Sequence, residues 1–351
     1  MINITAPINT LGYGIASYNI IKSLVASGEN INYYPIGSPE PPEQAIDILN
    51  AIKVDVVKLK SPSVKIWHQN DVHHHIGKGM HVAFPIFELD RFSDQEVKSL
   101  AHNDRIFVCS KWAKTVIEDC GIRVPVHVVP LGVDTETFSP APVSTRPKTV
   151  FFNCGKWEVR KGHDILVQCF NNAFDYNDDV ELWMMCQNPF YSAEQQNQWE
   201  RLYKDSKLGE KIRIIPRQNT HQDVYNIMKQ ADCGVFPARA EGWNLELLEM
   251  MACGKHVIAT DYSAHTEFCN EQNSMLIDIK SREIAQDGVW FNGQGMWASL
   301  DDDCIEQTVS HMRTVHAMKK SGSLGQNTDG IYTSREFSWE NSAKKFLDGL
   351  K

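Results

Sequence analysis

The segment Glu241–Gly254 constrains this chain more than any other part of it. A turn containing a glycine leads into a helix there, with Glu241 before the turn and Glu249 inside the helix. The residues around Glu249 are mostly apolar, and burying a carboxylate without a partner is costly. Sugar hydroxyls are suitable donors for such carboxylates, and the free N–H groups of a helix N-terminus favour phosphate. The pattern therefore predicts two carboxylates that bind hydroxyl groups of one ligand, with its phosphates between them.

Length and composition indicate a globular protein of two domains. A chain of 351 residues exceeds what one core usually organises, and 42% hydrophobic with 23% charged residues is ordinary. No apolar run reaches membrane-spanning length, and Met1–Thr5 lacks the basic start of a signal peptide. The 9 scattered cysteines favour reduced thiols, so we expect a cytoplasmic protein. The net charge of -9 argues weakly against a surface that coats nucleic acid or anionic lipid.

Short apolar strands alternate with helical patterns in both halves of the chain, which is typical of parallel sheets covered by helices. The first series of expected strands is Asn3–Ala6, Ile31–Pro35, Val64–Trp67, His81–Ile86, Arg105–Cys109 and Val126–Val129. After the proline-rich passage 138–147, the second series is Thr149–Asn153, Val180–Met185, Ile212–Ile215, Cys233–Phe236, His256–Ala259 and Met275–Ile277. We therefore expect an α/β protein with two Rossmann-like, doubly wound domains that face a central cleft.

Four motifs occur in register along the chain. They are Pro130–Asp134 with Phe138–Pro140, Gly155–His163, Glu241–Thr260 and Phe337–Glu340. They are similar to the P-x-G-V-D…F-x-P passage, the G-R…K-G turn, the E-x7-E block and the closing F-S-W motif of retaining GT-B glycosyltransferases of family 4, also called glycosyl transferases group 1. The resemblance covers nearly the whole chain and implies the GT-B fold. It assigns 1–140 to an acceptor-side domain, 141–335 to a domain that binds the nucleotide sugar, and 336–351 to a helix that packs back towards the first domain.

The resemblance also assigns catalytic and donor-binding residues. Lys156 and Lys161 would hold the diphosphate, although Lys156 replaces an arginine and lacks its bidentate fork, so Arg160 would share the contact. Glu241 would bind the donor sugar, and Glu249 would bind the ribose. Backbone N–H groups of the turn would contact sugar and phosphate: Gly242, Trp243, Asn244 and Leu245.

Structural alternatives stay open for these residues. The lysines would otherwise form a solvated basic turn, Glu241 would be an exposed loop carboxylate, and Glu249 would be a capped core residue. Glu246 has no counterpart in the motif, and we expect it to face solvent.

Gly12 and Gly14 lie between the first strand and the first helix, where a backbone without Cβ can approach a ligand closely. No third glycine completes a dinucleotide fingerprint, and no acidic residue ends the second strand. A nicotinamide oxidoreductase is therefore disfavoured. In the resembling family this loop lies beside the donor diphosphate and the acceptor, so ligand contact and simple packing are both open for the two glycines.

Relatives often place a histidine near the reacting carbon, but Phe84–Arg91 carries an E-x-D-R pattern instead. Glu88 and Asp90 are therefore candidate acceptor-side residues or parts of a structural turn. Three consecutive histidines, His73–His75, cannot all face one ion on a regular element. Asp301–Asp303 precede a late helix whose dipole they complement. We therefore expect no metal and no cofactor apart from the donor substrate.

The reaction implied by the resemblance is transfer of a sugar from a nucleotide diphosphate sugar to an acceptor hydroxyl, with retention and without metal. Lys156, Lys161 and the helix start at Asn244 would stabilise the departing diphosphate. A glycan is the expected acceptor. The alternatives are a DNA-modifying glycosyltransferase of the phage type, acting on hydroxymethylated bases, and a non-catalytic protein that binds nucleotide sugars. The sequence selects neither the donor sugar, the nucleotide base nor the oligomeric state.

Overall fold

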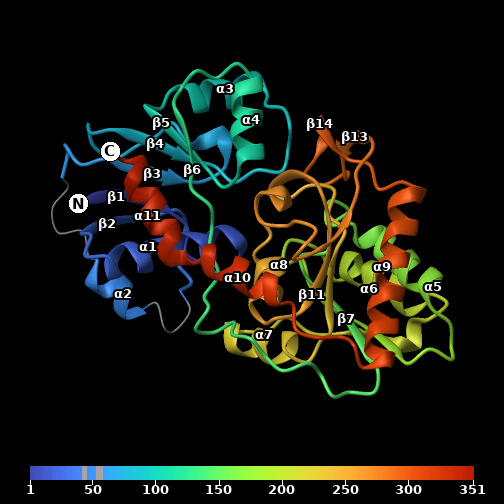
Figure 1. Cartoon of the computed structure of the whole chain (residues 1–351). Coiled ribbons are helices and arrows are strands. Elements are labelled where there is room, and N and C mark those ends of the chain that lie inside the picture. Colours follow the sequence, from blue (N-terminus) through green and yellow to red (C-terminus); the bar gives the residue numbers. More distant parts are fainter. Residues whose placement is uncertain (42–45, 53–57) are drawn as a thin grey trace. The chain divides into compact units, whose positions relative to one another are not determined.

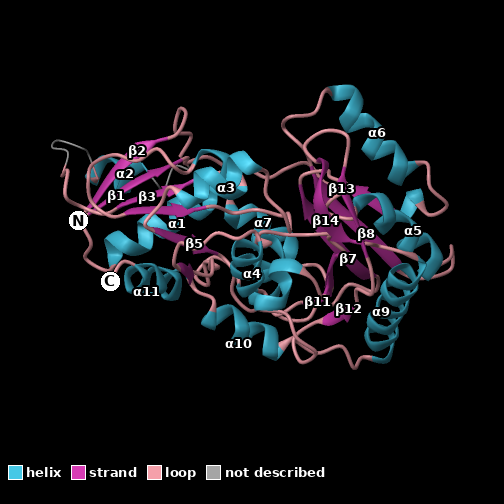
Figure 2. Cartoon of the chain, turned by 90° about the horizontal axis from the view of Figure 1, so that it is seen from above, coloured by secondary structure: helices cyan, strands magenta, loops and turns pink. Residues whose placement is uncertain are grey.

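The computed structural model describes residues 1–41, 46–52 and 58–351. Its contacts divide the chain into two units, Met1–Gly132 with Phe337–Lys351, and Val133–Glu336 (Figure 1). In each unit, helices lie against a parallel sheet (Figure 2). Within those described ranges, no helix is both long enough and apolar enough to cross a bilayer.

The first unit contains a 6-stranded sheet with the order β2-β1-β3-β4-β5-β6. Its strands are β1 (Ile2–Ala6), β2 (Ile31–Pro35), β3 (Ser63–Ile66), β4 (His81–Phe84), β5 (Arg105–Val108) and β6 (Val126–Val128). All the pairings are parallel. The order reverses direction between β1 and β3, and ligands of such sheets bind beside the carboxyl ends of the strands at this point.

The helices of the first unit are α1 (Gly12–Ala26), α2 (Ile46–Ala51), η2 (Gln69–Asp71), α3 (Asp94–Ala101), α4 (Lys111–Asp119) and α11 (Trp339–Gly349). Ser93 and Ser110 cap α3 and α4 as their sequence positions predict. The terminal helix α11 packs on α1, and the Phe346 ring lies 5.2 Å from that of Phe107. Helix α11 is therefore part of the core of the first unit.

The second unit contains a 6-stranded parallel sheet with the order β12-β11-β10-β7-β8-β9. Its strands are β7 (Thr149–Gly155), β8 (Val180–Cys186), β9 (Ile212–Ile214), β10 (Cys233–Phe236), β11 (His256–Thr260) and β12 (Met275–Ile277). Its helices are α5 (His163–Ala173), α6 (Ala193–Lys204), η3 (Gly209–Lys211), α7 (His221–Met228), α8 (Leu245–Ala252), η4 (Ser263–Glu267), α9 (Asp302–Ser321) and α10 (Thr328–Glu336).

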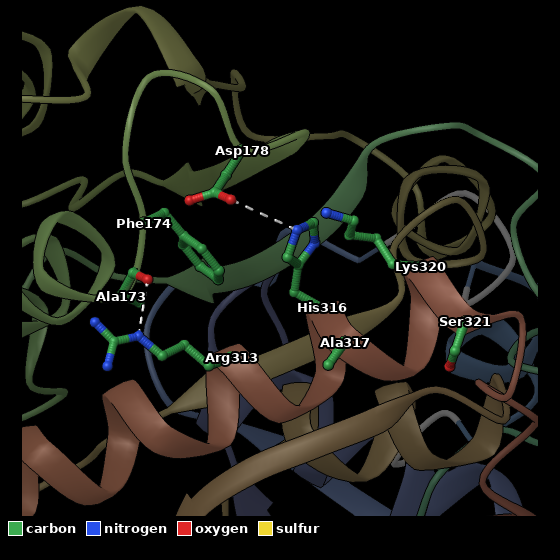
Figure 3. Close-up of a pocket in the computed structure, with 8 residues that line it drawn as sticks. All are labelled: Ala173, Phe174, Asp178, Arg313, His316, Ala317, Lys320 and Ser321. Atoms are coloured by element: carbon green, nitrogen blue, oxygen red, sulfur yellow. Dashed lines mark hydrogen bonds and ion pairs between the residues drawn. The ribbon is translucent and has the colours of Figure 1, made fainter.

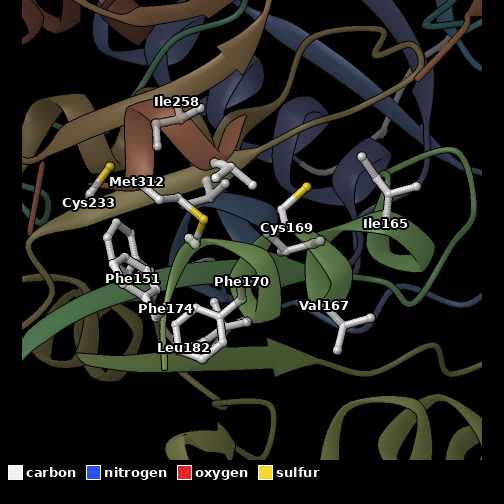
Figure 4. Packing of buried hydrophobic residues seen from close by; sticks show 14 of the residues in the cluster. Phe151, Ile165, Val167, Cys169, Phe170, Phe174, Leu182, Cys233, Ile258 and Met312 are labelled. Atoms are coloured by element: carbon white, nitrogen blue, oxygen red, sulfur yellow. The ribbon is translucent and has the colours of Figure 1, made fainter. Parts of the chain in front are cut away.

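The core of the second unit lies between its sheet and α5 and α9. Phe151, Phe170 and Leu182 are fully buried there with Met312 of α9 (Figure 4). The Asp301 side chain accepts the Cys304 N–H and begins α9, which confirms the helix start expected from the acidic run. Burial of these large apolar side chains stabilises the scaffold that carries the motif residues.

An antiparallel hairpin of β13 (Arg282–Gln286) and β14 (Asn292–Ala298) was not expected from the sequence. Its glycines and polar residues give no clear two-residue alternation. The buried Arg239 guanidinium joins the hairpin to the rest of the unit, because it pairs with Glu283 at 2.5 Å and Asp164 at 2.7 Å. Ion pairs between residues distant in sequence therefore attach this hairpin to the rest of the second unit.

Candidate active site

Two chain connections that carry the motif residues leave the same edge of the second sheet. Residues 156–162 connect β7 to α5, and residues 237–244 connect β10 to α8. Strands β7 and β10 are parallel neighbours, so both connections follow carboxyl ends. This is the edge at which open α/β sheets bind ligands.

The Glu241 carboxylate joins the two connections and is buried, with 5% of the residue exposed. Lys161 Nζ lies 2.8 Å from Oε1, and Arg160 Nη1 lies 2.8 Å from Oε2. The backbone N–H of Glu241 donates to Ser263 Oγ at 2.8 Å. Glu241 is thus not the exposed loop carboxylate of the alternative interpretation.

A second carboxylate, Glu158, extends this cluster. Its Oε2 lies 2.6 Å from Arg160 Nη2, and its Oε1 lies 2.7 Å from Lys156 Nζ. The Lys156 side chain is 36% exposed, and its ammonium lies 5.8 Å from the centroid of the Phe190 ring. Sequence reasoning missed Glu158, although an acid between Lys156 and Arg160 within a phosphate-binding motif was an available signal.

The charges of this cluster stabilise one another. Burial alone would raise the pKa of Glu241, but Arg160 and Lys161 outweigh it and hold that pKa well below the usual range. Burial would lower the pKa of Lys161, but Glu241 and Glu246 outweigh it and raise that pKa. Both groups therefore stay charged at neutral pH. Three cationic side chains are balanced here by the carboxylates of Glu158, Glu241 and the nearby Glu246, and Lys156 is the cation that stays partly exposed to an incoming anionic ligand.

The turn before α8 places backbone donors beside this cluster. Asn244 adopts a left-handed conformation with φ 82°, and its Oδ1 accepts the Leu247 N–H at 3.2 Å. In the described part of the chain, the N–H groups of Asn244 and Leu245 donate to no other protein group. The Trp243 ring packs 4.9 Å from that of Phe268 and is 2% exposed, so its side chain is structural. The helix tip retains free donors of the kind that bind phosphate.

Helix α8 carries two half-buried carboxylates, Glu246 and Glu249. Burial raises the pKa of Glu249 well above its usual range, and Glu246 and Asp134 add to this. No hydrogen bond or ion pair to the Glu249 carboxylate occurs among the described residues, so it is not a capped core residue. A Cβ on Gly155 would lie 3.4 Å from Glu246 Oε1, and Glu246 also acts on the pKa of Lys161. The expectation that Glu246 faces solvent was therefore wrong, because the approach of β7 to α8 half-buries it.

Gly162 allows the two connections to approach each other. Its φ is +71°, and a Cβ there would lie 2.0 Å from the Pro237 carbonyl oxygen. Only glycine meets both requirements without displacing the backbone. Gly162 directly follows Lys161, so it determines how close Lys161 can come to Glu241.

Two buried histidines position this site and were missed by sequence reasoning. His163 Nε2 lies 2.9 Å from Asn153 Oδ1, and burial followed by the charge of Lys161 lowers the pKa of His163 to about 3. His265 Nε2 lies 2.9 Å from Asn244 Nδ2, and burial lowers the pKa of His265 to about 4. Both imidazoles are neutral and act through hydrogen bonds. Their roles depend on partners distant in sequence, for which no local pattern exists.

The first unit brings together its own candidate residues at the carboxyl edge of its sheet. Gly12 begins α1 and has open space around it, whereas a Cβ on Gly14 would lie 2.3 Å from Asn9 atoms. Between them, Tyr13 Oη donates to the Ile86 carbonyl at 2.6 Å and accepts the Ile86 N–H at 2.9 Å. Gly14 therefore serves packing, while the surroundings of Gly12 leave room for a ligand.

The half-buried Glu88 and Asp90 follow β4 on the loop that Tyr13 contacts. Burial raises the pKa of Tyr13 and Glu88 adds to this, whereas the hydrogen bond to Ile86 opposes it. The loop after β1 and the loop after β4 thus form one polar region of the first unit.

The histidine-rich loop separates into two parts. His75 Nε2 lies 2.7 Å from Asn103 Oδ1, and its ring stacks on His81 at 4.6 Å. Asp71, His73 and His74 place one donor atom each within 4.8 Å of one another, a grouping that could hold a metal ion. Lys65 already pairs with Asp71 at 3.0 Å. This group belongs to the first unit, and the donor motifs belong to the second.

Comparisons with known proteins agree with this geometry. The family model described as glycosyl transferases group 1 matches residues 147–289, which include both connections. A protein designated glycosyltransferase 45 from Sulfolobus islandicus filamentous virus is 21% identical over 280 residues, or 76% of this chain and 73% of that protein. A GDP-mannose-dependent alpha-(1-6)-phosphatidylinositol dimannoside mannosyltransferase from Mycobacterium tuberculosis is 24% identical over 204 residues, which cover 56% of this chain and about half, 51%, of that enzyme.

Solved structures extend the likeness to the whole fold. Sucrose-phosphate synthase from Thermosynechococcus elongatus aligns with a TM-score of 0.72 over 99% of this chain and 97% of its own, at 14% identity. The trehalose-6-phosphate enzyme from E. coli, bound with UDP-2-fluoro glucose, aligns with a TM-score of 0.71 over 99% and 98%, at 10% identity. At such low identity, these alignments show a shared two-unit fold.

Proposed function

Because the chain is a glycosyltransferase with the GT-B fold, we propose that it moves a sugar from a nucleotide diphosphate sugar to a glycan hydroxyl. The observation that carries this proposal is the buried Glu241, held between Lys161 and Arg160 beside the open tip of α8. Buried carboxylates and cations at one sheet edge suit a ligand that has both hydroxyls and phosphates.

The diphosphate of the donor would lie between Lys156, Lys161 and the tip of α8. Lys156 is the most exposed cation of the cluster, so its ammonium can reach an incoming phosphate. The N–H groups of Asn244 and Leu245 would donate to phosphate oxygens, and the positive end of the helix dipole supports them. Arg160 would keep Glu241 in place, because its guanidinium is already bound to Glu158 and Glu241.

The hydroxyls of the donor would be bound by the two glutamates of the E-x7-E block. Glu241 is ionised and accepts hydrogen bonds from the sugar. Burial raises the pKa of Glu249, whose carboxyl group has no partner among the described residues, and the ribose hydroxyls would supply hydrogen bonds to it.

Catalysis would rest on charge stabilisation. The bond between sugar C1 and the diphosphate oxygen breaks, and a new bond forms between C1 and the acceptor oxygen on the same face. Attack on the same face retains the anomeric configuration, and the acceptor proton passes to the departing diphosphate oxygen. Lys156, Lys161 and the tip of α8 stabilise the negative charge that develops on the diphosphate, without a metal ion.

The acceptor would be a glycan that approaches Glu88 and Asp90 of the first unit. These carboxylates follow a carboxyl strand end and lie on the loop that Tyr13 contacts. The name of the mannosyltransferase relative, which acts on a dimannoside, supports a saccharide acceptor over a DNA base. None of the 9 cysteines forms a disulfide, which supports a reducing compartment such as the cytoplasm.

A thermal-shift screen with UDP, GDP and ADP tests the donor site. We expect one nucleoside diphosphate to stabilise the wild type and the Lys148→Ala control, whose lysine pairs with Glu181 at the surface. Stabilisation reaches about 2.7 kcal/mol when the ligand is at a hundredfold excess over its Kd. Lys161→Ala should lose this stabilisation, and equal stabilisation of Lys161→Ala would contradict the assigned site.

The acceptor is tested with the matching nucleotide sugar. Mass spectrometry of reactions with oligosaccharides and with hydroxymethylated DNA should find added sugar only on the oligosaccharides. Added sugar on DNA, or release of nucleoside diphosphate without any glycosylated product, would refute a glycan acceptor.

A further inference from the structure

A pocket of about 620 Å³ lies in the second unit, away from the edge that carries the donor motifs. Its walls are the C-terminus of α5, the passage into β8 and one face of α9 (Figure 3). These segments lie beside the amino ends of β7 and β8, since Thr149 begins β7 and Asp178 precedes β8. Amino and carboxyl ends of parallel strands occupy opposite edges of a sheet, so this pocket is separate from the donor site.

One face of α9 supplies the cationic groups of the pocket and His316. Arg313, His316, Ala317 and Lys320 follow the spacing that places side chains on one helix face. Ala317 is small and leaves the space between the longer side chains open (Figure 3). Arg313 and Lys320 on this helix face therefore line the pocket with positive charge.

His316 has a nitrogen without a hydrogen-bond partner in this wall. The residue is 8% exposed, and its Nδ1 lies 2.8 Å from Thr149 Oγ1. Its Nε2 points towards Asp178 Oδ1 at 3.9 Å, which exceeds a hydrogen bond (Figure 3). Such a buried polar atom costs free energy unless it obtains a partner. A ligand hydroxyl placed beside both atoms would satisfy them.

Asp178 supplies a fixed acceptor on the opposite wall. Its Oδ2 accepts the Asp175 N–H at 2.9 Å, and its backbone carbonyl accepts a hydrogen bond from Lys211. In the described ranges, Oδ1 makes no hydrogen bond, and its ion pair is the one with His316 at 3.9 Å. A carboxylate oxygen in this position selects a ligand that brings a donor such as a hydroxyl.

Arg313 and Lys320 supply positive charge on either side of His316. Arg313 Nε and Nη2 donate to the Ala173 and Asn172 carbonyls at 3.0 and 2.7 Å, so the guanidinium is oriented while Nη1 remains available. The exposed Lys320 ammonium has no ion pair within the described part of the chain. Two cations near one acceptor carboxylate suit a ligand with a dianionic group and hydroxyls.

We propose that this pocket binds a sugar phosphate at a second site of the molecule. The phosphate would pair with Lys320 Nζ, a sugar hydroxyl would donate to Asp178 Oδ1 and lie beside His316 Nε2, and Arg313 would add positive charge at the other end of the pocket (Figure 3). The ligand at this site is neither the donor nor the acceptor of the transfer reaction, because the pocket lies at the opposite edge of the sheet.

Isothermal titration calorimetry with glucose 6-phosphate tests this site in the full chain. Wild type should bind glucose 6-phosphate more tightly than glucose or inorganic phosphate. Lys320→Gln should weaken binding about tenfold by removing one charge-assisted contact. Lys345→Gln, which removes an exposed lysine from α11, is the matched control and should leave the affinity unchanged.

Two further variants separate this site from the others. Lys161→Gln should bind glucose 6-phosphate as wild type does, because it alters only the donor cluster. Asp178→Asn keeps an oxygen for the Asp175 N–H and should reduce the preference for glucose 6-phosphate over inorganic phosphate. The proposal is refuted if wild type does not bind at millimolar concentration, if Lys320→Gln binds equally well, or if Lys161→Gln abolishes binding.

Discussion

The two sheets share one architecture but present different chemistry at their carboxyl edges. Both are 6-stranded and parallel, and in both the strand order reverses beside a central strand. The edge of the second unit carries the ion-pair cluster of Glu241 and Glu158 with Lys156, Arg160 and Lys161. The edge of the first unit carries Tyr13, hydrogen-bonded to Ile86, and two half-buried carboxylates.

Under the proposed function, this difference corresponds to a division of roles between two similar folds. A dense cluster of buried charges is preorganised for a charged donor, and it costs no reorganisation when charge develops in the transition state. The first unit presents a tyrosine and two half-buried carboxylates in place of that cluster, and under the proposed function these would contact the hydroxyl groups of the acceptor. Fold alone would not distinguish the two edges, because function depends on the residues placed at each of them.

Lys161→Ala should cause the largest loss of activity. It removes a buried cation from the carboxyl edge of the sheet in the second unit and leaves the first unit unchanged. We expect transfer to fall by about 10²–10³-fold, the range measured when one preorganised donor is removed from an active site. Glu241 keeps its pair with Arg160, so the fold should persist. The measurement is kcat with the identified donor, and Lys148→Ala is the control. Wild-type turnover by Lys161→Ala would refute the assignment of charge stabilisation to this edge.

Glu241→Gln should lower stability by about 3 kcal/mol, because it leaves buried cations without their full compensation. Glu181→Gln, at the surface pair with Lys148, should change stability by less than about 1 kcal/mol. Chemical denaturation at neutral pH measures both. The folded pKa of Glu241 lies below the ordinary value of 4.5, so its contribution is present above pH 4.5 and is lost as pH falls further. If the difference in unfolding free energy between wild type and Glu241→Gln increased as the pH fell, the ion pairs of Glu241 with Arg160 and Lys161 would be contradicted.

Asp90→Asn and Glu88→Gln should affect only the carboxyl edge of the sheet in the first unit, where the proposed function places the acceptor. We expect the KM for the glycan acceptor to rise about tenfold, corresponding to one lost hydrogen bond to a charged group. Stabilisation by nucleoside diphosphate should not change. Steady-state kinetics at saturating donor measure the first effect, and thermal shift measures the second. If either variant weakened nucleotide binding but not acceptor binding, the division between the edges would fail.

Glu249→Gln should have the smallest effect, and its sign depends on pH. The folded pKa of Glu249 is raised above 4.5, so wild type loses stability as pH rises through that pKa, whereas glutamine does not titrate. The difference in Tm between Glu249→Gln and wild type should therefore increase between pH 5 and pH 8. Each kcal/mol of unfolding free energy that wild type loses corresponds to about 2–4 °C in this difference. Thermal unfolding without nucleotide measures this. A relative Tm that falls across this interval would show that Glu249 is paired.

Much of the scaffold could be predicted from local sequence. The six strands expected in each half all occur, and Ser93, Ser110 and Asp301 begin helices where their side chains can accept helix N–H groups. Apolar periodicity and capping act over a few residues, so they can be read from the chain directly. The β13–β14 hairpin lacks such a pattern and was missed.

The sequence by itself determined which residue types reach the ligand edge of each sheet, because strand ends and motif spacing are local properties. Only the tertiary structure decided their partners: Arg160 and Lys161 both bind Glu241, Glu246 is half-buried against Gly155, and His265 holds Asn244. Likewise, the pocket between α5 and α9 joins segments far apart in the chain. Charge pairing and burial depend on distances between side chains, and those distances are established only when the sheet brings distant segments together.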